Sequence, residues 1–260
     1  MTIYSLPDAG LDVIADYEHL ELGGKRVKAP YYMNKRKQKG GLRVMVGKGD
    51  PKEMEREVMV LAQVKGFAVQ QASAADLRAF LQDCDIGIDC SGFVVHVLNA
   101  ILAEKHMGTI DQYLVYPERG LTAKLRRLLR PVENTGANTL TSPANTVPVP
   151  IQDVRPGDLI RSKGLQKNAH HILLVERVGR EDDRVLWIDY VHSSEQYGDD
   201  NGIRHGRIEV TDQTAHLKDQ NWLEIQDGRN WTLEGLLKDY EDNGLRRLRR
   251  VTIPYVEQQQ

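Results

Sequence analysis

The chain has 260 residues, 40% of them hydrophobic and 28% charged, and a formal net charge of -2. This length suffices for one sizeable core, so we expect a single domain over residues 1–260. The charge offers no general attraction to nucleic acid or to an anionic membrane, and the basic clusters at 35–39, 124–130 and 246–250 lack interleaved aromatic residues. We therefore expect neither nucleic acid nor a membrane as a partner.

The N-terminal residues 1–8 have neither the basic start nor the apolar core of a signal peptide. No later run reaches the roughly eighteen apolar residues that a membrane span requires. The two cysteines, Cys84 and Cys90, are typical of a reducing compartment, although they would also permit one disulfide. These features predict a cytoplasmic protein.

Two helices are predicted between Tyr31 and Cys90. Asp50 caps the first, and Gly66 ends it. Ser73 caps the second, whose apolar face includes Cys84, so we interpret Cys84 as a structural residue. The short paired spacing of zinc ligands is absent, and we expect no metal or other cofactor.

The segment 87–98 places Cys90 at the start of a further helix, whose apolar residues recur at three-to-four spacing. Unpaired backbone N–H groups and the positive end of the helix dipole favour a thiolate at this position. The Cys90 N–H could also supply part of an oxyanion hole. The alternative is a buried, inert cysteine in a core helix.

Residues 122–130 form the next predicted helix, with Leu125, Leu128 and Leu129 turned inward. Residues 131–150 are rich in Thr, Asn, Ala and Pro and show no periodicity, which predicts a long loop. Such a loop is either a lid over a functional site or a plain connector.

Two strands are predicted at 170–178 and 184–192, with a polar link between them. If they form an antiparallel hairpin, His171 at the start of the first lies beside His192 at the end of the second. A cysteine, then a histidine, then a second polar residue is the order found in papain-like enzymes. There the imidazole takes the thiol proton and the third group holds the ring.

The C-terminal part contains predicted strands at 203–210 and 245–256, with a helix at 231–240 between them. Helices therefore precede strands along the chain. This order predicts an α+β fold in which the Cys90 helix packs against an antiparallel, barrel-like sheet that carries the histidines.

Four short motifs, in this order, resemble the NlpC family of papain-like cysteine peptidases. They are Asp89–Val94, Pro156–Ile160, His171–Ile172 and Val191–Ser193. The family's first segment is matched by a predicted helix at 12–22 followed by Pro30-Tyr31-Tyr32. The resemblance implies a papain-like fold and cleavage of short cell-wall peptides, commonly at the bond between a D-glutamate, linked through its side chain, and a diamino acid.

The same resemblance implies roles for individual residues. Cys90 would be the nucleophile, His171 the general base and then acid, and His192 the group that orients the imidazole. The free α-amine end of the peptide would be held by Tyr31, Asp89 and Ser91.

Neighbouring residues of a strand point to opposite faces, so only one of His170 and His171 can face the nucleophile. We prefer His171, because this register places apolar residues where the family has them. Asp189 and Glu195 are alternatives to His192 as the third group.

The interval between Tyr31 and Cys90 is longer than in the family, which indicates a helical insertion at about 35–86 that narrows the cleft. Together with the absence of an export signal, this predicts small tri- to tetrapeptides as substrates rather than intact wall polymer. Two other interpretations stay open. One is a papain-like amidase or acyltransferase acting on another amide or ester, and the other is a binding module with an inactive site.

Overall fold

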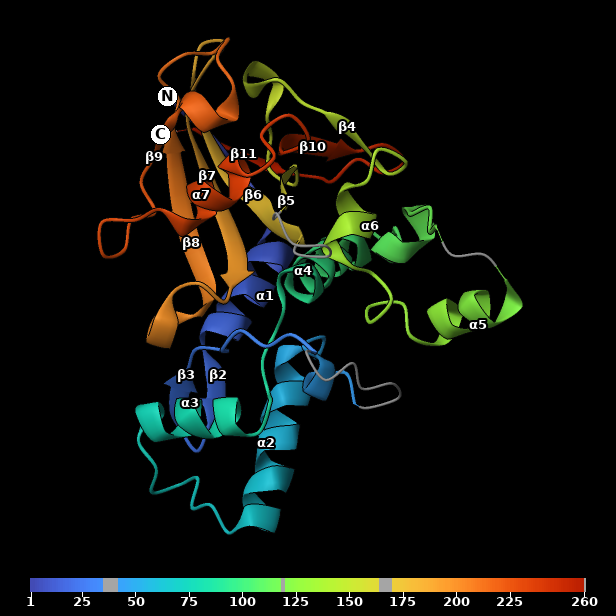
Figure 1. Cartoon of the computed structure of the whole chain (residues 1–260), viewed down its shortest axis with the longest axis vertical. Coiled ribbons are helices and arrows are strands. Elements are labelled where there is room, and N and C mark those ends of the chain that lie inside the picture. Colours follow the sequence, from blue (N-terminus) through green and yellow to red (C-terminus); the bar gives the residue numbers. More distant parts are fainter. Residues whose placement is uncertain (35–41, 118–119, 164–169, 260) are drawn as a thin grey trace.

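The computed structural model describes residues 1–34, 42–117, 120–163 and 170–259 (Figure 1). Within these ranges the chain forms seven α-helices, a nine-stranded sheet and a separate two-stranded hairpin. The helices are α1 (Asp8–Glu18), α2 (Pro51–Lys65), α3 (Ala74–Asp83), α4 (Cys90–Glu104), α5 (Leu121–Leu129), α6 (Ala137–Thr141) and α7 (Trp231–Leu237). The strands are β1 (Thr2–Ser5), β2 (Leu20–Leu22), β3 (Lys25–Val27), β4 (Thr146–Pro148), β5 (Leu159–Lys163), β6 (His170–Glu181), β7 (Arg184–Ser194), β8 (Gly202–Glu209), β9 (Asn221–Trp222), β10 (Gly244–Leu248) and β11 (Val256–Gln259). The predicted mixture of helices with an antiparallel sheet is confirmed.

The main sheet runs in the order β4-β10-β5-β6-β7-β8-β9, and all of its pairs are antiparallel. β6 is its central strand, because it pairs with β5 at its start, with β1 further along, and with β7 on its other edge. The predicted hairpin of β6 and β7 is confirmed, with Leu174 opposite Val191. The start of β6 and the end of β7 therefore lie side by side.

Both faces of β6 are covered, which explains its unbroken run of apolar residues. Ile172 and Leu174 belong to a core cluster that includes α4, whereas Leu173 and Val175 belong to a second cluster on the opposite face. α4 packs between α1 and the strands β6 and β7 (Figure 1). Its first residue is thus held close to the start of β6.

Helices α2 and α3 form the predicted pair and lie with the β2–β3 hairpin at the lower end of the molecule (Figure 1). Asp50 and Glu53 make a reciprocal capping box at the start of α2, and Gly66 ends the helix in a left-handed conformation. Ser73 makes the equivalent cap on α3, and Cys84, immediately after α3, is buried. These local signals are confirmed.

The prediction of a long loop over 131–150 is wrong. This segment contains α6 and β4, and β4 pairs with β10. Thr141 is buried and accepts a hydrogen bond from Arg161 at 2.7 Å, while Thr146 donates to the Thr141 carbonyl at 3.0 Å. Both elements are too short to show a sequence period, so contacts with distant strands stabilise them.

Helix α5 forms at the predicted place, but the inward direction of its leucines is wrong. Leu125, Leu128 and Leu129 are all exposed, and no residue of α5 is buried. The amphipathic pattern shows that one face is apolar, and whether anything covers that face depends on the rest of the fold.

The C-terminal prediction is wrong in one respect, because 245–256 is not one strand. β10 ends at Leu248, and the chain pairs again only from Val256, in β11, with β1. The predicted strand at 203–210 corresponds to β8, and the predicted helix at 231–240 to the shorter α7. None of the helices in the described ranges is long and apolar enough to cross a membrane.

Candidate active site

Cys90 is the first residue of α4 and lies beside the residue that caps this helix. The Asp89 carboxylate accepts the N–H of Gly92 at 2.7 Å, which satisfies one of the unpaired donors at the helix start. Cys90 is buried, with 6% of the residue's surface exposed.

The corner that leads into Cys90 is enclosed by two other segments of the chain. Ile88 forms one bridge with Tyr31 and another with Lys48. A Cβ atom at Gly87 would lie 2.4 Å from the carbonyl oxygen of Pro30, closer than real contacts allow. Glycine is therefore required here, and the corner brings Tyr31 close to the cysteine.

The sulfur of Cys90 contacts the backbone at the start of β6. Its Sγ lies 3.9 Å from the carbonyl oxygen of His170, and the N–H of Ile172 also interacts with it. These two groups flank His171 in the chain. The start of α4 therefore lies against the start of β6, next to the backbone of the base candidate His171.

Burial, followed by the charge of Asp89, raises the pKa of the Cys90 thiol to about 12. The Lys48 ammonium and the N–H groups of Ile172 and Ser91 lower this pKa only in part. The sequence predicts a thiolate at this helix terminus, but desolvation outweighs the helix terminus in the folded chain. The sulfur rests as a neutral thiol and needs a base to become a nucleophile.

A hydrogen-bonded relay begins at His171. His171 Nε2 lies 2.7 Å from His192 Nδ1, and His192 Nε2 lies 3.0 Å from Glu224 Oε1. Because a carboxylate only accepts hydrogen bonds, Glu224 fixes a proton on His192 Nε2, and in the neutral tautomer this leaves His192 Nδ1 as an acceptor. His171 then donates from Nε2, and its Nδ1 carries a free lone pair.

Burial lowers the pKa of His171 to about 3, and a charge on His192 acts in the same direction. The Glu224 carboxylate opposes this shift only partly. The resting His171 is thus a neutral imidazole, which is the form that accepts a proton. The resting pair is a neutral thiol with a neutral base.

Glu224 is the member of this relay that the sequence did not predict. Its side chain is 1% exposed and also accepts hydrogen bonds from Tyr190 at 2.8 Å, Thr232 at 2.7 Å and Arg204 at 2.9 Å. Burial alone would raise the pKa of Glu224, but His192 and the hydroxyl donors outweigh burial and hold it below its ordinary value. Glu224 lies just after β9, and this strand of two residues is too short to form a recognisable pattern in the sequence.

The two alternatives for the third group have other positions. The Asp189 carboxylate pairs with Arg207 at 2.6 and 2.8 Å, so it is engaged away from the relay. Glu195 follows β7 and lines the pocket in front of His171. The structure thus places His192 against the imidazole of His171 and engages Asp189 with Arg207.

A pocket of about 430 Å³ opens beside this relay, between the start of β6, the end of β7 and α7. Its lining includes Tyr31, His170, His171 and Trp231. Burial, and then the charge of Cys90, raise the pKa of Tyr31 above its ordinary value, so Tyr31 lies close to both the pocket and the sulfur. The volume suits a small ligand.

Asp89 and Ser91 are held by a buried lysine that the sequence did not single out. Lys48 Nζ lies 2.9 Å from Asp89 Oδ1 and 2.6 Å from Ser91 Oγ, and it donates to the Thr135 carbonyl at 3.2 Å. A Cβ atom at Gly92 would lie 3.0 Å from Lys48 Cδ, so glycine leaves the room that this lysine needs. The carboxylate and hydroxyl expected to grip a substrate amine already hold an ammonium group of the protein.

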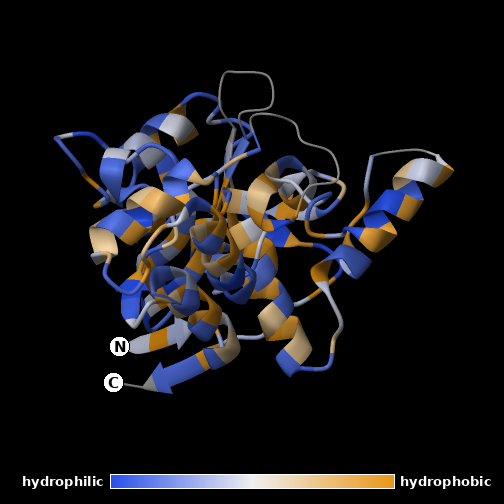
Figure 2. Cartoon of the chain, turned by 90° about the horizontal axis from the view of Figure 1, so that it is seen from below, coloured by the Kyte–Doolittle hydropathy of each residue, from blue (hydrophilic) through white to orange (hydrophobic). Residues whose placement is uncertain are grey.

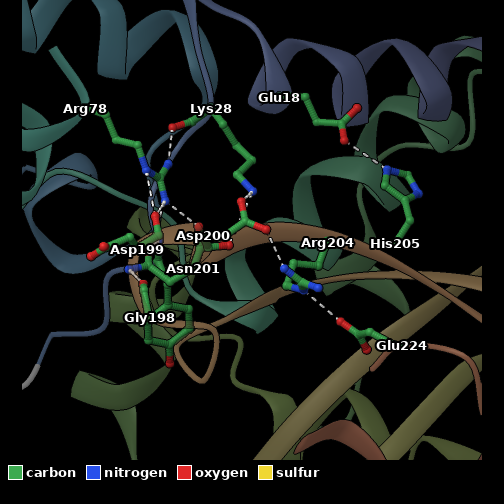
Figure 3. A network of polar contacts seen from close by, with 11 residues as sticks. Glu18, Lys28, Arg78, Gly198, Asp199, Asp200, Asn201, Arg204, His205 and Glu224 are labelled. Carbon is green, nitrogen blue, oxygen red and sulfur yellow. Dashed lines mark hydrogen bonds and ion pairs between the residues drawn. The ribbon is translucent and has the colours of Figure 1, made fainter. Parts of the chain in front are cut away.

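A second polar network ties the predicted insertion to the relay (Figure 3). Arg78 of α3 donates to the carbonyls of Lys28 and Asn201, both at 2.6 Å. Asp200, beside Asn201, pairs with Lys28 and with Arg204. Arg204 in turn donates to Glu224 at 2.9 Å, so a continuous chain of contacts runs from α3 to the buried carboxylate (Figure 3).

Comparison of the chain with models of protein families, with characterised proteins and with solved structures finds no match in any of the three. Within the ranges that the structure describes, no group of three or more His, Cys, Asp and Glu side chains is arranged to hold a metal ion. The interpretation of the site therefore depends on the geometry of Cys90, His171, His192 and Glu224.

Proposed function

We propose that this chain is a papain-like cysteine hydrolase that cleaves an amide bond in short peptides of cell-wall type, by way of an acyl-enzyme on Cys90. The observation that carries the proposal is the buried relay from His171 through His192 to Glu224, which starts where the sulfur of Cys90 contacts β6. A histidine whose imidazole is held by a second histidine and a buried carboxylate, on the segment that contacts a buried thiol, suits nucleophilic catalysis.

Acylation starts from the neutral pair. His171 Nδ1 takes the thiol proton as the sulfur attacks the substrate carbonyl, and the Cys90 N–H at the start of α4 stabilises the oxyanion. The tetrahedral intermediate collapses as the carbon–nitrogen bond breaks, and His171 returns the proton to the leaving amine. The peptide acyl group then remains on sulfur as a thioester.

Deacylation uses the same base. His171 takes a proton from water, the resulting hydroxide attacks the thioester carbonyl, and the carbon–sulfur bond breaks while Cys90 recovers its proton. In both half-reactions His171 is transiently an imidazolium beside His192. The Glu224 carboxylate stabilises that charge through His192, which explains the need for an ionised group so deep in the protein.

The substrate class comes from the resemblance to NlpC peptidases, whose motifs include Cys90 and His171. The bond in question is the one between a γ-linked D-glutamate and a diamino acid. Tyr31 is a candidate for contacting the peptide, because it lines the pocket. Asp89 and Ser91 are candidates only if the substrate displaces Lys48 from them.

Lys48 favours a second candidate function. Because its ammonium satisfies Asp89 and Ser91 from inside the protein, the Asp89 carboxylate is not a vacant counterion for a substrate α-amine. This suits an amidase or acyltransferase acting on an amide or ester that lacks a free amine. The chemistry at Cys90 would be the same, and the acceptor of the acyl group would be water or an amine.

The test uses tripeptides with γ-linked D-glutamate followed by a diamino acid, prepared with a free and with an acetylated N-terminus, and a small peptide ester. Products are followed by mass spectrometry, and the acyl-enzyme is located by peptide mapping. Cys90→Ala should lose all turnover. Cys84→Ala is the matched control, since Cys84 is equally buried but lies at the end of α3.

Cleavage of the free tripeptide at the diamino acid would support the peptidase. An acyl adduct on Cys90 with the ester, together with cleavage of the acetylated peptide alone, would support the second candidate. Absence of any adduct on Cys90 with all three compounds would refute both and leave a binding module.

A further inference from the structure

Helix α5 exposes an unusual amount of apolar surface. Leu121, Leu125, Leu128 and Leu129 are 57% to 85% exposed, and no residue of the helix is buried. Figure 1 shows α5 standing apart from the other helices and from the sheet, and Figure 2 shows the same projection from below. Four large exposed leucines on nine residues are more than scattered surface residues would provide.

The leucines share one side of the helix. At 3.6 residues per turn, positions 121, 125, 128 and 129 fall within a stripe about 100° wide. The remaining side carries Lys124, Arg126 and Arg127, and α5 contains no acidic residue. Arg127 lies over the ring of Tyr116 at 4.5 Å, which fixes the roll of the helix against the short segment that precedes it.

These features decide what can cover the helix. An apolar stripe flanked only by cations suits an anionic surface and opposes a basic one. A nine-residue helix with no buried residue is marginal in water, so burial of the leucines would stabilise it. A lipid surface meets both needs without any matching groove, because the leucines enter the acyl boundary while the basic side chains reach the phosphates.

We propose that α5 is a docking helix for an anionic lipid surface. The leucine stripe supplies the apolar contact, and Lys124, Arg126 and Arg127 supply the attraction to headgroup phosphates. The net charge of the chain does not reveal the local positive charge of α5, because acidic residues elsewhere balance it. The docking does not depend on the reaction assigned to Cys90.

The test is co-sedimentation of the full chain with vesicles of phosphatidylcholine alone and of equal parts phosphatidylcholine and phosphatidylglycerol. We expect binding to the anionic vesicles, weakened by added salt, and little binding to the neutral ones. Leu128→Gln should weaken binding about tenfold through lost apolar contact. Arg126→Gln should weaken it about fivefold through the lost charge.

Val64→Gln is the matched control, because Val64 on α2 is 77% exposed, as is Leu128, but lies on another helix. It should bind as the unaltered chain does. Circular dichroism checks that each variant keeps its helices, and size-exclusion chromatography reports self-association. Equal binding to both vesicle types, an equal effect of Val64→Gln, or a dimer that Leu128→Gln dissociates would each overturn the proposal.

Discussion

Replacing Glu224 by glutamine tests the relay most directly, because the substitution keeps the shape and removes the charge. Glu224 accepts four hydrogen bonds, and all four donors lie 2.7 to 3.0 Å from its two oxygens. Glutamine keeps only one of the two acceptor oxygens. Its NH₂ group, which can only donate, then faces other hydrogen-bond donors. The imidazolium of His171 then loses its anionic support through His192.

The expected loss in kcat/KM is about a hundredfold. In a triad whose carboxylate touches the base itself, the equivalent change costs roughly 10⁴-fold, and here one more hydrogen bond separates the carboxylate from the base. The free energy of unfolding should fall by about 1–3 kcal/mol, since Arg204 and His192 lose a charged partner. Ester hydrolysis gives the rate, and urea unfolding gives the stability.

Glu209→Gln is the control, because Glu209 is an exposed carboxylate that accepts one bond, from Asn221 at 2.7 Å. It should leave both quantities unchanged. A Glu224→Gln variant within about threefold of the unaltered rate (about 0.7 kcal/mol), while His192→Ala loses far more, would show that the carboxylate has no part in the relay. The functional relay would then consist of His171 and His192 alone.

The base, the thiol and the ion pairs of His205 can each be tested separately. His171→Ala should abolish acylation by a peptide ester, whereas His170→Ala should retain most of it; a dead His170→Ala variant would mean that the other histidine is the base. Iodoacetamide should label Cys90 more slowly than free glutathione at neutral pH and faster as pH rises, because its pKa is about 12; mass mapping that found rapid labelling in mild acid would contradict this. Burial disfavours the charged form of His205, but hydrogen bonds to Glu176 and Glu18 outweigh it and raise the pKa to about 10. The raised pKa stabilises the folded chain fully below the unfolded pKa of about 6.5, and this stabilisation is lost as pH rises through the folded value. Thermal unfolding of His205→Gln should therefore show a loss of stability that is largest at acid pH and disappears at high pH. A loss of stability independent of pH would refute the assignment.

Elements with local signals can be read from the amino-acid sequence alone. The capping residues Asp50 and Ser73 and the stop at Gly66 lie within a few residues of the helix ends that they set. The two apolar runs and the polar link of the β6–β7 hairpin also act over a short range, so the pattern of residues is enough to pair His171 with His192.

Features that depend on contacts between distant segments are set by the folded chain as a whole. Glu224 reaches His192 from beyond β9, and Lys48 reaches Asp89 across 41 positions of sequence. The neutral state of the Cys90 thiol follows from how completely the fold removes it from water, which the helix terminus alone does not reveal. The exposure of the α5 leucines also depends on the whole fold. A helical period shows which residues share a face, but their burial requires a packing partner that the local sequence does not specify.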